Sequence, residues 1–313
     1  MEKIVIPELD CPISPAINEN VEIAHNHNIQ WACDFKLIPD NGEKYERFCA
    51  AKFAWLFARS YPDVSIDELN LLCDLFTWYF VVDDLLDEYA PKEVDIFGKG
   101  VMDILKSSIT VQNHPLFYGL YDIQPRMLAK IPAFWRHRFV CHLQQWFQAV
   151  RWEAVNRIKN TIPDLAIFTK MRLFAGGMYL GFDMINAFSQ KYRSHHGFLE
   201  HIYVQQLEMM ANNYICWTNG ILGCHRDLKN GEVQNVVIVL QKEYSCSLQE
   251  ACNRAVDMCN AEISAFFSLK SQLPSIGETE NHSLKHYING LQIWMRAYLD
   301  WGTKDTKRYQ VEE

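Results

Sequence analysis

The 313-residue sequence has no stretch rich in proline, glycine and serine, no block of like charges and no shift of composition along its length. Such features mark linkers and domain boundaries, so their absence favours a single domain over residues 1–313. The alternation of apolar and polar residues that is typical of half-buried strands is almost absent as well. Together these absences predict one all-α domain.

Several functional classes are also disfavoured by what is missing. The ten cysteines form no CxxC pair and no group with histidine at zinc-binding spacing, which predicts reduced thiols. The segment Met1–Pro7 lacks the apolar core of a signal peptide, and no apolar run is long enough to span a membrane. A net charge of −8 gives no electrostatic reason to expect nucleic acid. We therefore expect a cytoplasmic protein without stable membrane insertion.

Helical periodicity is present along most of the chain. Ser65–Glu68 and Ser247–Glu250 have the form of capping boxes, which begin helices. His25 and His27 lack carboxylate partners at metal-binding spacing and are expected in a surface loop. The expected helices, which form an α-helical bundle, cover residues 43–60, 65–88, 98–110, 115–129, 132–160, 163–189, 198–227, 231–243, 247–271 and 281–301.

Four carboxylates in six residues follow the apolar run 75–82: Asp83, Asp84, Asp87 and Glu88. In a helix, Asp83 and Asp87 lie on one face, and that face continues the apolar stripe of the preceding turns. Carboxylates on an apolar face are costly without partners, and Mg²⁺ prefers carboxylate oxygen together with water and substrate phosphate. The pattern predicts a diphosphate held through metal, and the alternative is a solvated acidic helix end.

A second group of candidates lies in the expected helix 198–227. Asn219, Gly223 and Asp227 are spaced at i, i+4 and i+8, so they are stacked over two turns on one face. The stretch before Asn219 is largely apolar, so its amide is expected to be buried and to need a partner. On spacing alone a metal role for these residues is weakly supported.

The order of the two motifs resembles that of the class I terpene synthases of bacterial and fungal type. In that family an aspartate-rich helix faces an Asn-x-x-x-Ser/Thr-x-x-x-Glu helix, and the two hold three Mg²⁺ ions, with Mn²⁺ as a substitute, against an isoprenoid diphosphate. Arg172 lies 47 residues before Asn219, where the family has its diphosphate-sensing arginine, and Arg308-Tyr309 resembles the terminal RY pair. The likeness extends from about residue 11 to residue 309 and implies an antiparallel bundle of the isoprenoid synthase type.

The resemblance also implies roles for individual residues. Diphosphate would be bound by Arg172, Arg226, Arg308 and Tyr309, while a helix break at Gly176 would transmit its binding to the cavity. Aromatic faces stabilise carbocations, and the candidates for the cavity wall are Phe76, Phe80 and Trp301.

The second motif departs from the family pattern at three positions, one of which is Gly220 in place of the common aspartate beside Asn219. Gly223 stands where a serine or threonine would ligate a metal, and Asp227 stands where the family has glutamate. Gly223 removes a hydroxyl ligand, whereas Asp227 is one methylene shorter than glutamate but remains a hard-oxygen ligand. These changes weaken the prediction that the second motif binds its one Mg²⁺ ion, whereas the two ions expected on the aspartate-rich helix are not directly affected.

Three classes of function remain open. The first is a terpene cyclase acting on farnesyl diphosphate, or on the longer geranylgeranyl diphosphate as a diterpene cyclase. The second is a chain-elongating prenyltransferase, which needs a second DDxxD motif that the chain lacks. The third is a degenerate, non-catalytic protein that binds a prenyl diphosphate, supported by Gly223. Many members of the family dimerise, so a homodimer is left open.

Overall fold

The computed structural model describes residues 4–106 and 114–310. Those residues contain no strand, which confirms the all-α prediction. The α-helices are α1 (Val21–Asp34), α2 (Glu43–Ala51), α3 (Phe53–Ser60), α4 (Ile66–Leu86), α5 (Pro91–Leu105), α6 (Pro115–Lys130), α7 (Ala133–Ile158), α8 (Leu165–Ala175), α9 (Met178–Ala187), α10 (Ile202–Lys229), α11 (Val236–Tyr244), α12 (Leu248–Ser271) and α13 (Glu278–Asp300). A 3-10 turn, η1 (Gly197–Glu200), precedes α10, and a π-helical turn, η2 (Trp301–Asp305), follows α13. The expected continuation of α5 to residue 110 lies outside the described residues.

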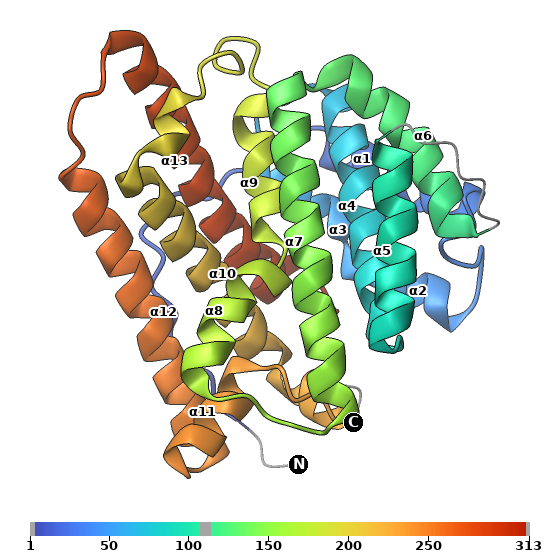
Figure 1. Ribbon diagram of the computed structural model, residues 1–313, viewed down its shortest axis with the longest axis vertical. Coiled ribbons are helices and arrows are strands. Elements are labelled where there is room, and N and C mark those ends of the chain that lie inside the picture. The colour runs from blue at the N-terminus through green and yellow to red at the C-terminus, as the bar shows by residue number, and fades with distance from the viewer. Residues whose placement is uncertain (1–3, 107–113, 311–313) are drawn as a thin grey trace.

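The helices form a bundle in which α7, α9, α10 and α13 stand between two outer groups (Figure 1). On one side α12 packs against α10 and α11. On the other side α4 packs against α1, α3 and α6, and α5 packs against α7. α8, which packs on α7 and α10, ends near the middle of the bundle and is continued by α9 after a break. None of the described helices is long and apolar enough to cross a bilayer.

Local sequence explains where several helices begin and end. The main-chain N–H of Ser65 donates to the Glu68 carboxylate at 2.9 Å, so the predicted capping box starts α4. The predicted helix 43–60 is in fact two helices, because Lys52 adopts a left-handed conformation with φ of 49°. The predicted helix over 231–243 starts only at Val236, where the Asn235 side chain accepts from the Val237 N–H and caps α11.

The sequence did not indicate α1, because part of its buried face is polar. Asn28 is 1% exposed, and its Oδ1 accepts a hydrogen bond from Thr77 Oγ1 at 2.9 Å. The expectation of a surface loop for His27 was wrong, since its Nε2 lies 3.0 Å from the carboxylate of the fully buried Asp74. Arg126 on α6 donates to the same carboxylate at 2.7 Å. A polar network therefore ties α1 and α6 to α4.

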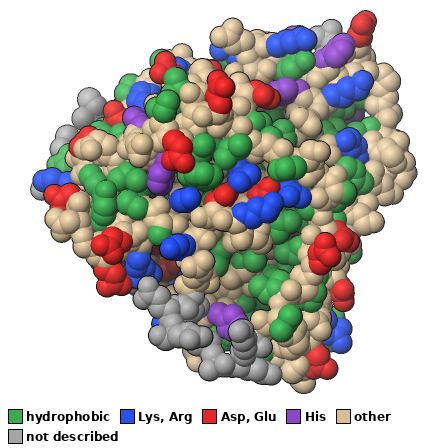
Figure 2. Space-filling model, turned by 180° about the vertical axis from the view of Figure 1, so that it is seen from behind, with side chains coloured by type: hydrophobic (Ala, Val, Ile, Leu, Met, Phe, Trp, Pro, Cys, Tyr) green, Lys and Arg blue, Asp and Glu red, His purple; other side chains and the backbone are tan. Residues whose placement is uncertain are grey.

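The face seen in Figure 2 carries side chains of both charges. Lysine and arginine lie interspersed with aspartate and glutamate, and hydrophobic side chains show between them. The excess of acids in the chain, 38 against 30 basic residues, is therefore not gathered into a single block on this face.

Candidate active site

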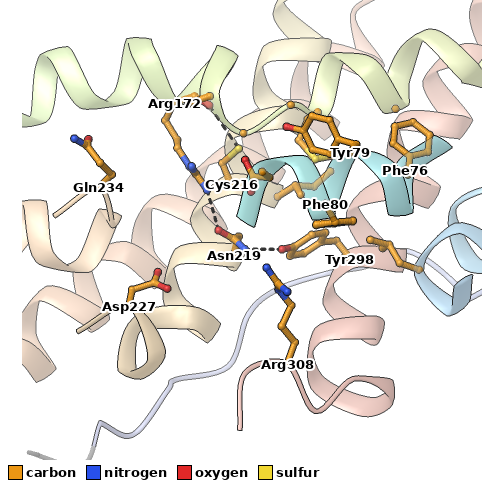
Figure 3. A pocket seen from close by; sticks show the side chains of 18 of the residues that line it. Phe76, Tyr79, Phe80, Arg172, Cys216, Asn219, Asp227, Gln234, Tyr298 and Arg308 are labelled. Atoms are coloured by element: carbon orange, nitrogen blue, oxygen red, sulfur yellow. Dashed lines mark hydrogen bonds between the residues drawn. The ribbon is translucent and has the colours of Figure 1, made fainter. Parts of the chain in front are cut away.

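A pocket with a cavity of about 150 Å³ lies between α4, α8, α10 and the carboxyl-terminal segment. In Figure 3, Arg172, Asn219, Asp227 and Gln234 lie on one side of it, and the ring of Phe76 lies on the other. The charged residues of the lining are Asp83, Asp87, Glu153, Arg157, Arg172, Arg226, Asp227, Glu232 and Arg308, and its aromatic residues are Phe57, Phe76, Tyr79, Phe80, Trp294, Tyr298 and Tyr309.

The aspartate-rich motif lies at the end of α4, and only part of it reaches this pocket. Asp83 and Asp87 line the pocket, whereas Asp84 and Glu88 do not. Burial and the neighbouring Asp84 carboxylate raise the pKa of Asp83 to about 6. Partial burial and the Asp83 carboxylate likewise raise the pKa of Asp87. The raised pKa values mean that the charged forms of both carboxylates are destabilised here, an effect that a bound cation would offset.

Two arginines flank this motif. Arg157 on α7 donates to the main-chain carbonyls of Leu86 and Tyr89, at 3.0 and 3.4 Å, and so caps the carboxyl-terminal end of α4. Its guanidinium also lies 3.6 Å from the Asp87 carboxylate. Arg308 donates to Asp84 at 2.7 Å, so the carboxyl-terminal segment is tied to the same helix end.

The second motif is held in a network of side chains. Asn219 Oδ1 accepts a hydrogen bond from Arg172 at 2.8 Å, and its amide nitrogen donates to the hydroxyls of Tyr298 and Tyr309, at 2.7 and 3.2 Å (Figure 3). Tyr298 and Tyr309 are joined by a hydroxyl–hydroxyl bond of 2.6 Å. Asn219 is half-buried, not fully buried as expected, and its amide has hydrogen-bond partners on both its oxygen and its nitrogen. The carboxylate of Glu153 lies 3.7 Å from the Arg172 guanidinium.

Asp227 also lines the pocket, and both of its oxygens have protein partners. Oδ1 accepts from the guanidinium of Arg226 at 2.9 and 3.0 Å, and Oδ2 accepts from the amide of Asn235 at 2.8 Å. Gly223 is outside the lining, but a Cβ placed on it would lie 3.3 Å from an Asp227 oxygen. The three predicted residues of this motif are therefore close neighbours, with Gly223 contributing no side-chain ligand.

The predicted aromatic wall is present in part. Phe76 and Phe80 line the pocket, and the guanidinium of Arg308 lies 5.8 Å from the ring centre of Phe80. Trp301 does not line the pocket, so the structure contradicts its predicted place in the wall. Its indole N–H donates to the carbonyls of Ala51 and Lys52, both at 3.0 Å, which holds the fully buried ring behind Phe80.

Comparison with known proteins assigns the family. Residues 74–265 match the model of terpene synthase family 2, C-terminal metal binding. The chain is 32% identical over 305 residues to (+)-T-muurolol synthase of Roseiflexus castenholzii, covering 95% of this chain and 91% of that protein. The chain belongs to this terpene synthase family. It is also 28% identical to germacrene A synthase of Nostoc punctiforme, over 100% of this chain and 98% of that protein.

Solved structures agree with the fold of this class I terpene synthase. The crystal structure of germacradien-4-ol synthase from Streptomyces citricolor superposes with a TM-score of 0.83 at 22% identity, covering 95% of this chain and 98% of that one. α-Eudesmol synthase superposes with a TM-score of 0.84 at 19% identity, covering 95% and 98%. The similarity of fold extends over nearly the whole synthase.

The donor set of the synthase pocket suits a hard divalent cation. Asp83 and Asp87 present carboxylate oxygens from α4, and Asn219 and Asp227 present amide and carboxylate oxygens from α10. In the described part of the chain no three acidic, histidine or cysteine side chains lie close enough to hold one ion. Mg²⁺ commonly takes one or two carboxylates and completes its shell with water and substrate phosphate, so these residues fit such an ion.

Several pocket residues of the synthase were not predicted as site residues from the sequence. Glu153 and Arg157 lie four residues apart on α7, a spacing that is common in solvated helices. Gln234 was expected within a helix but lies between α10 and α11, and both polar atoms of its amide are buried without a hydrogen-bond partner among the described residues. Burial and the neighbouring Asp227 raise the pKa of Glu232, although nearby arginines oppose that rise. Glu153 and Arg157 belong to no recognisable motif. Glu232 and Gln234 lie in the run 231–237, which resembles the family sequence after the second motif but gave neither residue a role.

Restoring a hydroxyl at position 223 should strengthen metal binding. Gly223→Ser places a hydroxyl beside the Asp227 carboxylate, where it supplies one more hard-oxygen ligand. We expect a lower Mg²⁺ concentration at half-maximal rate, measured by titrating Mg²⁺ at saturating substrate. Gly223→Ala is the matched control, because it adds the Cβ without the hydroxyl. An equal or higher Mg²⁺ requirement in the serine variant would mean that a water molecule already serves as the metal ligand at this position.

Proposed function

We propose that this terpene synthase is a cyclase that acts on farnesyl diphosphate and releases diphosphate and a cyclic sesquiterpene hydrocarbon or alcohol. The observation that carries the proposal is one pocket lined by both charged residues and aromatic rings, with Arg172, Asn219 and Asp227 on one side and Phe76 on the other (Figure 3). The (+)-T-muurolol synthase relative is described as cyclizing (2E,6E)-farnesyl diphosphate, and a relative of Metarhizium brunneum is a sesquiterpene synthase. These names support the fifteen-carbon substrate.

The charged end is suited to bind the leaving group. As the carbon–oxygen bond of the substrate breaks, its electron pair departs with the diphosphate, whose growing charge would be neutralised by Arg172, Arg226 and Arg308. The Tyr309 hydroxyl and the unpartnered Gln234 amide are further donors for phosphate oxygens. Three Mg²⁺ ions, or Mn²⁺ in their place, would supply the remaining positive charge. We assign them to Asp83 and Asp87 on one side and to Asn219 and Asp227 on the other.

The aromatic end is suited to the cation that remains. An allylic carbocation is stabilised by the faces of aromatic rings and destroyed by water. Phe76 and Phe80 extend from the same helix as Asp83, so the rings lie directly beyond the end that would bind diphosphate. Phe57, which also lines the pocket, stacks on Phe76 with ring centres 4.9 Å apart and so extends that part of the wall.

The proposal is tested by incubating the purified protein with geranyl, farnesyl and geranylgeranyl diphosphates, with Mg²⁺ or with chelator. Products are identified by gas chromatography and mass spectrometry. We expect a Mg²⁺-dependent cyclic fifteen-carbon product from farnesyl diphosphate. A cyclic product from the twenty-carbon substrate alone would make the protein a diterpene cyclase. Recovery of all three substrates intact, with binding retained, would contradict the proposal and favour a non-catalytic prenyl-diphosphate-binding protein.

A further inference from the structure

The break between α8 and α9 leaves a main-chain carbonyl without its helical partner. α8 ends at Ala175, and Gly177 takes a left-handed conformation with φ of 67° before α9 begins. At this turn the Gly177 N–H donates to the carbonyl of Phe174 at 3.2 Å. In a continuous helix it would bond to Leu173, four residues earlier. The Leu173 carbonyl therefore needs another donor.

The donor comes from α10. Asn212 is fully buried, and its amide nitrogen donates to the Leu173 carbonyl at 2.8 Å. The thiol of Cys216, one turn further along α10, donates to Asn212 Oδ1 at 3.1 Å. With a donor fixed on the oxygen, the nitrogen is the atom left to face Leu173. The hydrogen bonds on both ends of the amide thus fix its orientation and tie the last turn of α8 to α10.

The far side of the break is anchored separately. Asp183 on α9 is fully buried, and its carboxylate lies 2.9 Å from Arg138 Nε and 2.8 Å from His142 Nδ1, both on α7. α9 is therefore fixed to α7 through paired charges. The position of the α8 end relative to α9 depends on a different contact, that between Leu173 and Asn212.

The segment held in this way is part of the cavity wall. Ala175, Gly176, Gly177 and Met178 all line the pocket, as does Cys216. Arg172, in the same turn as Leu173, is bound through its guanidinium to Asn219, seven residues after Asn212 and on the same helix. Two contacts therefore hold the end of α8 on α10. The Arg172 guanidinium bonds to Asn219 at the charged end of the pocket, and the Leu173 carbonyl accepts from Asn212 at the cavity wall.

We propose that Asn212 is a positioning residue that fixes the contour of this wall and thereby decides which cyclic product the synthase forms. The inference rests on the proposed function, because it concerns the cavity in which the substrate would be folded. Competing cyclisations differ by small barriers, and a change of wall contour alters their ratio exponentially. A residue that only stabilised the fold would change the amount of active protein and leave that ratio unaltered.

The test compares Asn212→Leu with Asn213→Leu. Asn213 is the next residue of α10, but its amide donates to Glu262 at 2.8 Å, toward α12 and away from the break. Each variant loses one donor amide of the same helix, and Asn212→Leu also loses the acceptor of the Cys216 thiol. Asn213→Leu therefore controls for the general loss of an asparagine from α10. We expect the ratio of main product to by-products from farnesyl diphosphate to fall by about fivefold or more in Asn212→Leu and to be unchanged in Asn213→Leu.

A second readout does not depend on turnover. Amide hydrogen exchange of residues 173–180 is expected to be about tenfold faster in Asn212→Leu, because the end of α8 loses its anchor, and to be at the wild-type rate in Asn213→Leu. If Asn212→Leu does not fold, Asn212→Asp takes its place, since aspartate keeps the shape and removes the donor to Leu173. If the wild type makes no product from any prenyl diphosphate, the proposed function fails, and hydrogen exchange decides the role of Asn212.

The proposal would be overturned by an unchanged product ratio in a folded Asn212 variant. It would also be overturned if both leucine variants shifted the ratio alike, since the effect would then be a general loosening of α10. Wild-type exchange rates at residues 173–180 in the Asn212 variant would show that the break is held by other contacts.

Discussion

Asp83→Asn is expected to lower kcat by about a thousandfold while leaving the protein folded. Asparagine keeps the shape of the side chain but removes the charge that would bind Mg²⁺ at the pocket. Charge stabilisation by a metal is worth several kcal/mol in the transition state, and about 1.4 kcal/mol corresponds to a factor of ten in rate. The melting temperature should not fall, because Asp83 is repelled by Asp84 in the absence of metal. The measurements are steady-state diphosphate release and a thermal melt.

Asp67→Asn is the matched control for this prediction. Asp67 is an exposed acid in the first turn of the same helix, so the substitution is chemically identical and far from the pocket. It should leave kcat unchanged and cost a fraction of a kcal/mol in stability, through the helix dipole. Wild-type turnover in Asp83→Asn would remove the aspartate-rich motif from the mechanism, whatever the control does.

The parts of the fold that were predictable from the sequence are those in which local signals and burial agree. Ser65 and Glu68 start α4, and the apolar spacing after them places Asp83 on the face that lines the pocket. The family resemblance implied a helix break at Gly176, and the break is present between α8 and α9. In these places each residue's own conformational preference points to the same structure as the packing does.

The unpredicted parts depend on contacts between residues far apart in the chain. Lys52 interrupts the predicted helix 43–60, although neither glycine nor proline is present there to indicate a break. α1 buries a polar face whose partners lie far along the chain: Asp74 is 47 residues from His27, and Thr77 is 49 residues from Asn28. Trp301 is an aromatic residue of the kind expected in a cavity wall. The hydrogen bonds from its indole N–H to the carbonyls of Ala51 and Lys52, at the end of α2, hold it outside the pocket. These features depend on contacts between residues that are distant in the sequence, and the periodicity of apolar residues carries no information about such contacts.

Gly176→Ala is expected to destabilise the synthase and to reduce its activity, and Cys216→Ala is expected to rescue both. A Cβ on Gly176 would lie 2.3 Å from the Cys216 sulfur, well inside van der Waals contact. The backbone at Gly176 has φ of −68°, which alanine adopts without strain, so the clash with sulfur is the main cost. Overpacking of this kind costs about 1–3 kcal/mol in the free energy of unfolding. Urea denaturation and diphosphate release measure the two effects.

The double variant separates the steric explanation from any other role of Gly176. Removing the sulfur clears the space that the new methyl group enters, so the two changes should be coupled by about 1 kcal/mol or more in a double-mutant cycle. Gly119→Ala on α6 is the control, because its Cβ would meet neighbouring atoms only at 3.4 Å and beyond, and it should not destabilise the protein. If Cys216→Ala failed to rescue Gly176→Ala, the glycine would be required for the conformation of the break itself. The wall of the cavity would then depend on the backbone of α8 more than on the packing of α10 against it.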